Sequence, residues 1–125
     1  MASFSVTYQA YVNQPPTIGN YTMSKANREG ATIGTTLTTA MFTTSTTPAY
    51  SDIEGDSADA VRINTLPTNG AVLKLDGVIV TVGQTITIAD ITSGKLKLVA
   101  PDVNALTTSV FTFSVRDTGS MVFSS

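Results

Sequence analysis

The 125-residue chain contains no cysteine, no histidine and no tryptophan. Without cysteine, no disulfide contributes to stability and no thiol can act as a nucleophile. Without histidine, the side chain that most often serves as a general base near neutral pH is missing. The two absences also remove the usual ligands of zinc. We therefore do not expect an enzyme.

Charged residues are also scarce, at 13% of the chain, and the formal net charge is −2. The seven basic residues are scattered, so nucleic acid has little electrostatic support as a partner. No run approaches the roughly 18 apolar residues that span a bilayer, which argues against a membrane partner. The N-terminus lacks the basic start and apolar run of a secretory signal. For a complete chain, this predicts synthesis in a cytoplasm without use of the general secretion route.

A composition rich in threonine and poor in strong helix formers favours strands. In the second half of the chain, short segments alternate apolar and polar residues, and turns containing glycine separate them. Strands are predicted at 61–64, 72–75, 78–82, 84–88, 95–98 and 110–115, with turns at Asn69–Gly70 and Asp76–Gly77 and one helical turn at 89–93. This spacing favours an all-β sandwich, and a barrel is the alternative.

The first half of the chain has a less regular pattern. A short strand is predicted at 18–23, a polar turn at 25–30 and a loop at 43–51. Residues 31–42 carry apolar residues at a spacing that also fits a helix, but their threonines and glycine favour a strand that runs into a loop. A second loop is predicted at 102–108.

The N-terminal segment alternates Phe4, Val6 and Tyr8 with polar residues, and the alternation continues to Val12. This pattern predicts a half-buried strand, which the two prolines within residues 13–16 set apart from the rest. Two interpretations are open: an edge strand within the chain, or an arm that pairs with a neighbouring chain. The predicted organisation is an N-terminal strand or arm at 1–12 and a sandwich at 13–125.

A last apolar patch, 121–123, lies at the C-terminus. It either pairs as a final strand or stays exposed as a contact site. The predicted interaction residues belong to this patch and to the N-terminal segment, and they are Phe4, Val6, Tyr8, Met121, Val122 and Phe123.

Four of the nine acidic residues fall within eight positions, at Asp52, Glu54, Asp56 and Asp59. Gly55 permits a sharp turn there, so several carboxylates can converge. Calcium takes six to eight oxygen ligands, and this turn is a candidate start of such a site. The predicted calcium ligands are Asp52, Glu54, Asp56 and Asp117, the last of which approaches from the closing strand. The alternative is a solvated acidic turn.

A catalytic carboxylate pair is not expected, because these acids share one short turn instead of flanking a deep substrate groove. The hydroxyl groups have no histidine to activate them. Arg62 and Arg116 are predicted to pair with nearby carboxylates, and Lys95 and Lys97 to mark a solvent-facing side or to protect an edge strand. The four tyrosines are spread over separate segments, which favours packing over a sugar-binding surface.

An ordered series of short motifs runs through about residues 13 to 119. It consists of Asn13-x-Pro-Pro, Asp52-x-Glu-Gly-Asp56, Val61-Arg-Ile63, Leu66-Pro67, Asn69-Gly70, Asp76-Gly77-Val78, Gly83-Gln84, Ala89-Asp-Ile91, Ser93-Gly94-Lys-Leu96, Pro101 and Phe111-Thr-Phe-Ser-Val-Arg-Asp117. The series resembles the bacterial cadherin-like, immunoglobulin-like repeats of large surface proteins. This resemblance implies an immunoglobulin-like β-sandwich of about seven to nine strands, here with an extra N-terminal strand.

Modules of that kind serve as spacers, adhesive units or binding modules, often with calcium near the acidic turn, and similar modules occur on bacteriophage particles. The chain departs from the adhesin pattern in having one copy, no secretion signal and an extra strand. We therefore expect a non-enzymatic virion accessory protein of the head, neck or tail that attaches through its terminal strands. Its expected partners are other virion proteins or its own copies in a homo-oligomer, and calcium is the one cofactor considered. The alternatives are a calcium-binding extracellular adhesin repeat and a carbohydrate-binding module that recognises host surface glycans.

Overall fold

The computed structural model describes residues 1–8, 14–22, 34–101, 108–119 and 121–124. These residues form seven strands, one short α-helix and one 3-10 helix. The strands are β1 (Thr35–Thr36), β2 (Ala58–Thr65), β3 (Val72–Leu75), β4 (Val78–Ile79), β5 (Thr85–Thr87), β6 (Leu96–Val99) and β7 (Thr112–Asp117), and the helices are η1 (Thr39–Phe42) and α1 (Ile88–Thr92). Within this described part, no helix is long and apolar enough to cross a membrane.

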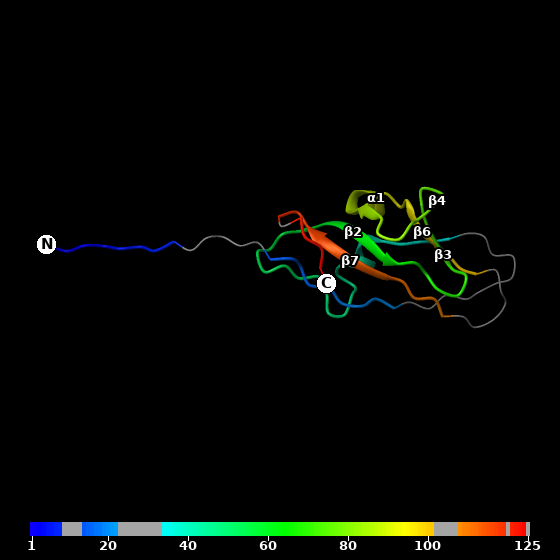
Figure 1. Ribbon diagram of the computed structural model, residues 1–125, viewed down its shortest axis with the longest axis horizontal. Coiled ribbons are helices and arrows are strands. Elements are labelled where there is room, and N and C mark those ends of the chain that lie inside the picture. Colours follow the sequence, from blue (N-terminus) through cyan, green and yellow to red (C-terminus); the bar gives the residue numbers. More distant parts are fainter. Residues whose placement is uncertain (9–13, 23–33, 102–107, 120, 125) are drawn as a thin grey trace.

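The strands form two antiparallel sheets. One sheet has four strands in the order β1-β6-β3-β4, and the other has three in the order β5-β2-β7. β2 and β7 pair over the longest stretch and run side by side in Figure 1. The all-β prediction is confirmed as a two-sheet, sandwich-like structure.

The core is built from both sheets and from the two helices. Its buried members are Leu37, Phe42, Val61, Ile63, Leu73, Val80, Ile86, Ile91, Leu96 and Val115. Alternate residues of a strand face the same side of a sheet, which is why the predicted apolar positions of β2, β3, β6 and β7 point inward together. Lys95 and Lys97 are exposed, as predicted for the solvent-facing side of β6.

Two of the turns between strands use residues in the left-handed region. Asn69 and Gly70 have φ angles of 59° and 83°, and Asp76 and Gly77 have φ angles of 49° and 80°. Glycine takes such angles without a Cβ clash, and asparagine and aspartate tolerate them better than most residues. The second turn closes the hairpin of β3 and β4. Both predicted turns are confirmed.

Helix α1 forms where the sequence predicts a helical turn. Its N-cap is Thr87, whose side-chain oxygen accepts a hydrogen bond of 3.1 Å from the main-chain N–H of Asp90. Because Thr87 caps the helix, β5 ends there, and Ile88 begins the helix instead of extending the predicted strand. Ile91 is buried and ties the helix to the core.

The strand predicted at 78–82 is shorter than expected. The main-chain N–H of Thr81 donates to Oε1 of Gln84 (3.0 Å), and the N–H of Gln84 donates back to the carbonyl of Thr81 (3.2 Å). This turn directs the chain into β5 and ends β4 early. Of the three valines expected on one side, Val80 is buried, whereas Val78 and Val82 are 70% and 65% exposed.

The first half of the chain departs further from prediction. In place of the strand predicted at 18–23 there are two isolated bridges, Thr17 with Ser51 and Asn20 with Thr47, and residue 23 lies outside the described part. Gly19 lies so close to the main chain at Thr47 that a Cβ on it would collide. Four main-chain hydrogen bonds of 2.7–3.1 Å in these two bridges hold this segment in place.

Of the strand predicted at 31–42, only β1 is a strand, and residues 31–33 lie outside the described part. Helix η1 follows and places Phe42 in the core, which accounts for the helix-compatible spacing of the apolar residues. The loop predicted at 43–51 is confirmed. The turn predicted at 25–30, and all but the last residue of the loop predicted at 102–108, lie outside the described residues.

Residues 1–8 run away from the sheets as an extended segment (Figure 1). All eight are exposed, and none of them makes a hydrogen bond to another residue of the described chain. The prediction of a half-buried strand is therefore wrong for residues 1–8, while residues 9–12 lie outside the described part. We call residues 1–8 the N-terminal arm.

Candidate functional site

The side chain of Asp52 shapes the acidic turn. Its Oδ1 accepts hydrogen bonds from the main-chain N–H groups of Glu54 (2.9 Å) and Asp56 (3.2 Å), and its main-chain carbonyl accepts one from Gly55 (3.0 Å). Gly55 has a φ of 79°, an angle that glycine takes cheaply. Aspartate commonly organises turns through such bonds to the following backbone. The turn therefore follows from its own local sequence.

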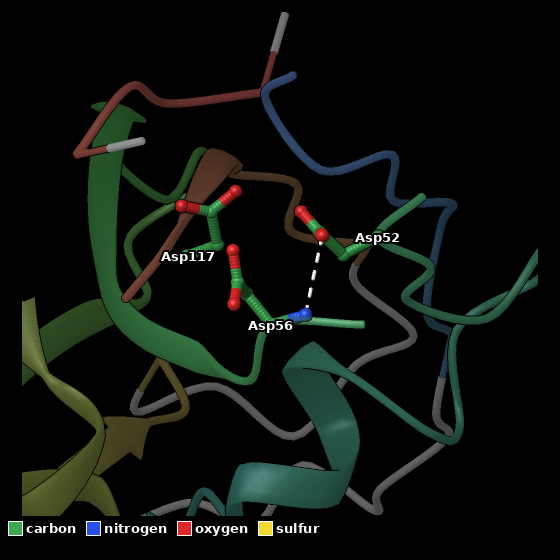
Figure 2. Close-up of side chains that lie close together, drawn as sticks. All are labelled: Asp52, Asp56 and Asp117. Atoms are coloured by element: carbon green, nitrogen blue, oxygen red, sulfur yellow. Dashed lines mark hydrogen bonds between the residues drawn. The ribbon is translucent and has the colours of Figure 1, made fainter. Parts of the chain in front are cut away.

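Strand β7 brings a third carboxylate to this turn. Asp117, the last residue of β7, pairs with Ala58 at the start of β2 and is fully buried. One carboxylate oxygen from each of Asp52, Asp56 and Asp117 lies within 4.8 Å of the other two. Figure 2 shows the three side chains converging from the turn and from the end of β7. We call these three residues the acidic cluster.

Glu54, the fourth predicted ligand, is not one of the three converging carboxylates, although its side chain hydrogen-bonds with that of Asp52 and raises the pKa of Asp52. Its Oε1 accepts a hydrogen bond of 2.6 Å from the main-chain N–H of Gln14, so it fastens the segment that follows the arm to the acidic turn. Asp59 also has another partner, because its Oδ2 lies 2.6 Å from the guanidinium of Arg116. The predicted pairing of Arg116 with a carboxylate is confirmed. Arg62 instead donates to the side chain of Asn64 (3.1 Å).

The surroundings of Asp52 raise its pKa. Burial raises the pKa of Asp52 above its ordinary value of 3.8, and hydrogen bonding with the carboxyl of Asp117 raises this pKa further. The main-chain N–H groups of Asp56 and Glu54 act in the opposite direction. Oδ2 of Asp52 is shielded from water, which explains why desolvation is the largest cause.

Tyr50 borders the acidic cluster. Its hydroxyl donates a hydrogen bond of 2.8 Å to the main-chain carbonyl of Asp56. Burial raises the pKa of Tyr50 to about 12, with further contributions from the negative charges of Asp52, Asp117 and Asp56. Tyr50 therefore remains a neutral hydrogen-bond donor at physiological pH and holds the turn without adding charge.

The acidic cluster offers oxygen ligands only. Such ligands suit calcium, magnesium or manganese and do not suit the thiolate- and imidazole-seeking metals. Repulsion among three close carboxylates is relieved either by uptake of a proton or by binding of a cation. The donor set is therefore compatible with the calcium prediction.

The predicted C-terminal interaction residues divide into two kinds. Phe123 bridges to Arg116 and lies against the guanidinium groups of Arg62 (4.5 Å) and Arg116 (5.4 Å). Met121 and Val122 are 56% and 52% exposed. Of the two alternatives predicted for this patch, half-buried Phe123 follows the pairing one, whereas its two neighbours present apolar surface.

The predicted N-terminal interaction residues are all on the surface. Phe4 and Tyr8 are 92% and 88% exposed, and Val6 is 55% exposed. Single exposed apolar side chains are normal on protein surfaces. Here three of them stand at alternate positions of one extended segment, a pattern that puts side chains on one side when the segment pairs as a strand.

Sequence reasoning missed an apolar groove of about 580 Å³. Phe42, Phe111 and Phe113 form its aromatic part, with ring centroids 4.9 Å apart for Phe42 and Phe113 and 6.4 Å apart for Phe111 and Phe113. Among its described lining residues none is acidic. The sequence signal is the pair of phenylalanines two positions apart at the start of β7. Only the folded chain shows that their rings remain half-buried.

Protein-family models, curated proteins and solved structures give no match to this chain. The resemblance to cadherin-like and immunoglobulin-like repeats therefore stays a prediction from the sequence. The described residues themselves provide a two-sheet body, the acidic cluster, the apolar groove and the exposed N-terminal arm.

Proposed function

We propose that this chain is a non-enzymatic structural and interaction module of immunoglobulin-like fold, a virion accessory protein that attaches to its neighbours through its terminal segments and above all through the N-terminal arm. The observation that carries the proposal is the exposure of Phe4, Val6 and Tyr8 on a segment that makes no hydrogen bond to the rest of the described chain.

The arm gains free energy by finding a partner. Burying one large apolar side chain is worth roughly 1.5–3 kcal/mol. An extended segment with apolar residues at alternate positions is suited to join the edge of another sheet, where main-chain hydrogen bonds give affinity and the alternate side chains give specificity. The arm therefore has the physical properties of an attachment strand.

The remainder of the chain supports a structural role. It offers neither thiol nor imidazole for catalysis. Outside the acidic cluster, Glu54 holds Gln14 and Asp59 holds Arg116, so these acids stabilise the fold. Modules that resemble its motif series occur on bacteriophage particles, and the virion assignment rests on that resemblance.

Deletion of the N-terminal arm, residues 1–8, tests the proposal. The shortened chain should keep the thermal unfolding transition of the full chain, because the arm has no hydrogen bond to the described body. It should no longer co-sediment with assembled particles that carry the protein. A shortened chain that unfolds, or one that binds particles as tightly as the full chain, would contradict the proposal. Full-length chain with Ser5→Thr and Thr7→Ser, which changes only the polar side of the arm, is the matched control and should bind normally.

Two alternatives predicted from the sequence are weighed by specific observations. The acidic cluster favours a calcium-dependent adhesin repeat, and a calcium titration tests this function. For a carbohydrate-binding module, a glycan array is the test. The described tyrosines do not gather on one surface, since Tyr8 lies on the arm, Tyr21 lines the apolar groove and Tyr50 borders the acidic cluster. This distribution disfavours a carbohydrate-binding surface.

A further inference from the structure

The apolar groove opens between the two sheets beside the segment 18–22. Leu37 and Leu98 line it from the side of the four-stranded sheet, and Phe111 and Phe113 line it from the β7 side. Its volume of about 580 Å³ is in the range of sites that enclose a small-molecule ligand. The groove is therefore large enough to accept bulky apolar side chains from outside.

The first half of β7 presents an open main-chain edge at this groove. The main-chain groups of Ile63 bond to the segment before β5 (3.0 and 2.7 Å), so its partner Phe113 on β7 turns its own N–H and C=O away from β2. Val115, two residues later, turns the same way, and its N–H and C=O bond to Ser124 (2.9 and 2.8 Å). The C-terminal segment thus covers the second half of this edge. In the described chain, no residue takes the equivalent position beside Phe113.

The N-terminal arm has the pattern that such an edge accepts. Consecutive residues of a strand advance about 3.4 Å, so Phe4, Val6 and Tyr8 project to one side at intervals of about 7 Å. Ser5 and Thr7 project to the other side, where they would face water. An apolar residue of the arm, such as Val6, that pairs with Phe113 would form hydrogen bonds with both its N–H and its C=O. Phe4 and Tyr8, two residues away on either side, would then point to the same side and enter the groove.

We propose that the N-terminal arm of one copy of this chain lies in the apolar groove of a second copy, paired with the open edge of β7, so that two copies exchange arms. The inference rests on the proposed function and names the partner of the arm. The hydrogen bond between Gln14 and Glu54 (2.6 Å) holds the chain at the acidic turn, and residues 1–8 extend away from the body (Figure 1). This direction presents the arm to another molecule.

The area buried by such an exchange matches that of a stable dimer. Each arm carries two aromatic side chains, and an aromatic side chain buries roughly 150–250 Å². The two arms together therefore bury roughly 600–1,000 Å² of accessible surface. The two grooves bury a similar accessible area, so the total is roughly 1,200–2,000 Å², the size of a stable interface. A closed twofold exchange fills both grooves and leaves no arm unpaired.

The absence of cysteine makes disulfide trapping a direct test. One full-length chain carries Val6→Cys, and a second, longer tagged chain carries Ala100→Cys or Ser109→Cys, two small half-buried positions that line the groove. Mixed under mild oxidation, the two chains should form a disulfide-linked heterodimer. A partner chain with Val82→Cys, which is exposed and lies outside the groove lining, is the matched control and should cross-link far less.

Three outcomes would overturn the proposal. Cross-linking of the groove positions no stronger than that of the Val82→Cys control would place the arm elsewhere. In a chain that carries both Val6→Cys and Ala100→Cys, a disulfide within one chain, without disulfide-linked dimers, would show that the arm occupies its own groove. A wild-type chain that stays monomeric at all accessible concentrations in sedimentation equilibrium would exclude the exchange.

Sedimentation equilibrium also separates this inference from the proposed function. Phe4→Ser should raise the dimer dissociation constant roughly a hundredfold, because each of the two arms in a dimer loses about tenfold in affinity. The control Ser5→Ala should change it less than about threefold. If Phe4→Ser abolishes binding to particles while the wild type is a monomer, the arm binds a different protein and only the inference fails. If Phe4→Ser alters neither the oligomer nor particle binding, both fail.

Discussion

The guanidinium carbon of Arg62 lies 4.5 Å from the centre of the Phe123 ring, and Arg116 approaches the same ring to 5.4 Å. A positively charged guanidinium group is attracted to the electron-rich face of an aromatic ring, a cation–π interaction. Here the guanidinium groups of Arg62 and Arg116 fix the C-terminal segment against the three-stranded sheet. Ser124, the next residue, can then pair with Val115. This contact covers the second half of the β7 edge, whereas no described residue pairs with the first half, next to the apolar groove.

Replacement of Phe123 should destabilise the fold. Phe123→Ala removes both cation–π contacts and a half-buried ring, and we expect the free energy of unfolding to fall by on the order of 1–2 kcal/mol. Urea denaturation measures the change. Met121→Ala, at an exposed position two residues earlier, is the control and should alter the free energy by less than about 0.5 kcal/mol. Equal losses for the two variants would contradict the role of the Phe123 ring.

Removing the charge of Asp52 should stabilise the chain at neutral pH when divalent cations are chelated. In Asp52→Asn, the amide oxygen can still accept the hydrogen bonds from Glu54 and Asp56. Because the pKa of Asp52 is raised in the folded state, the folded chain holds its proton more tightly than the unfolded chain above pH 3.8. Wild-type stability attributable to Asp52 therefore falls as the pH rises past that value.

The measurement is the melting temperature of both chains as a function of pH. The curves should lie close together below pH 3.8, and Asp52→Asn should become the more stable chain as the pH rises to neutrality. A wild type that remains the more stable protein at neutral pH would show that ionised Asp52 is not disfavoured.

Calcium should raise the melting temperature of the wild type if the acidic cluster binds it as the sequence predicts. At a hundredfold excess over its dissociation constant, a ligand adds about 2.7 kcal/mol, which is roughly 10 °C for a domain of this size. Asp56→Asn should not respond, because it removes one of three converging carboxylates. Asp76→Asn has the same change of charge in a distant turn and should respond as the wild type does. An unchanged melting temperature of the wild type would reject the calcium site.

Tyr50→Phe should lose the tyrosine ionisation step near pH 12 of the alkaline titration. The pKa of Tyr50 is raised from 10.0 to about 12, so tyrosinate absorbance should retain a step near pH 12 in the wild type and lack it in the variant. The variant also loses the hydrogen bond to Asp56, at a cost of about 1 kcal/mol. Since the raised pKa favours neutral Tyr50 in the folded state, its contribution is complete below pH 10 and disappears as the pH rises through 12. Identical titration curves would refute this account.

Much of the second half of the fold was predictable because its signals are local. The period-two pattern of β2 and β7 places Val61, Ile63 and Val115 on the core side without knowledge of their partners. The first half was not predictable in the same way. At Gly19 the decisive interaction is with the main chain near residue 47, which no pattern around Gly19 encodes.

The candidate site shows the same division. The hydrogen bonds of Asp52 to the next few residues follow from its own turn, and the sequence could nominate Asp117 as a further ligand. It could not tell that Glu54 would turn to Gln14 instead, because that choice depends on where the segment before the sandwich crosses the turn. Nor could it tell that the row of Phe4, Val6 and Tyr8 lies in solvent, since alternation looks the same whether the opposing sheet belongs to the same chain or to another.

By itself the sequence determined β2, β3, β5, β6 and β7, the two glycine turns, the helical turn and the absence of thiol and imidazole groups. These properties depend on side chains and backbone angles within a few residues of one another. Only the tertiary structure decided which carboxylates meet, where β7 has no partner among the described residues and that the N-terminal arm makes no hydrogen bond to the described body. Each of these features depends on strand register and on packing between segments far apart in the chain. The stability of such a contact depends on residues from both segments, and no pattern within one segment shows which residues it will meet.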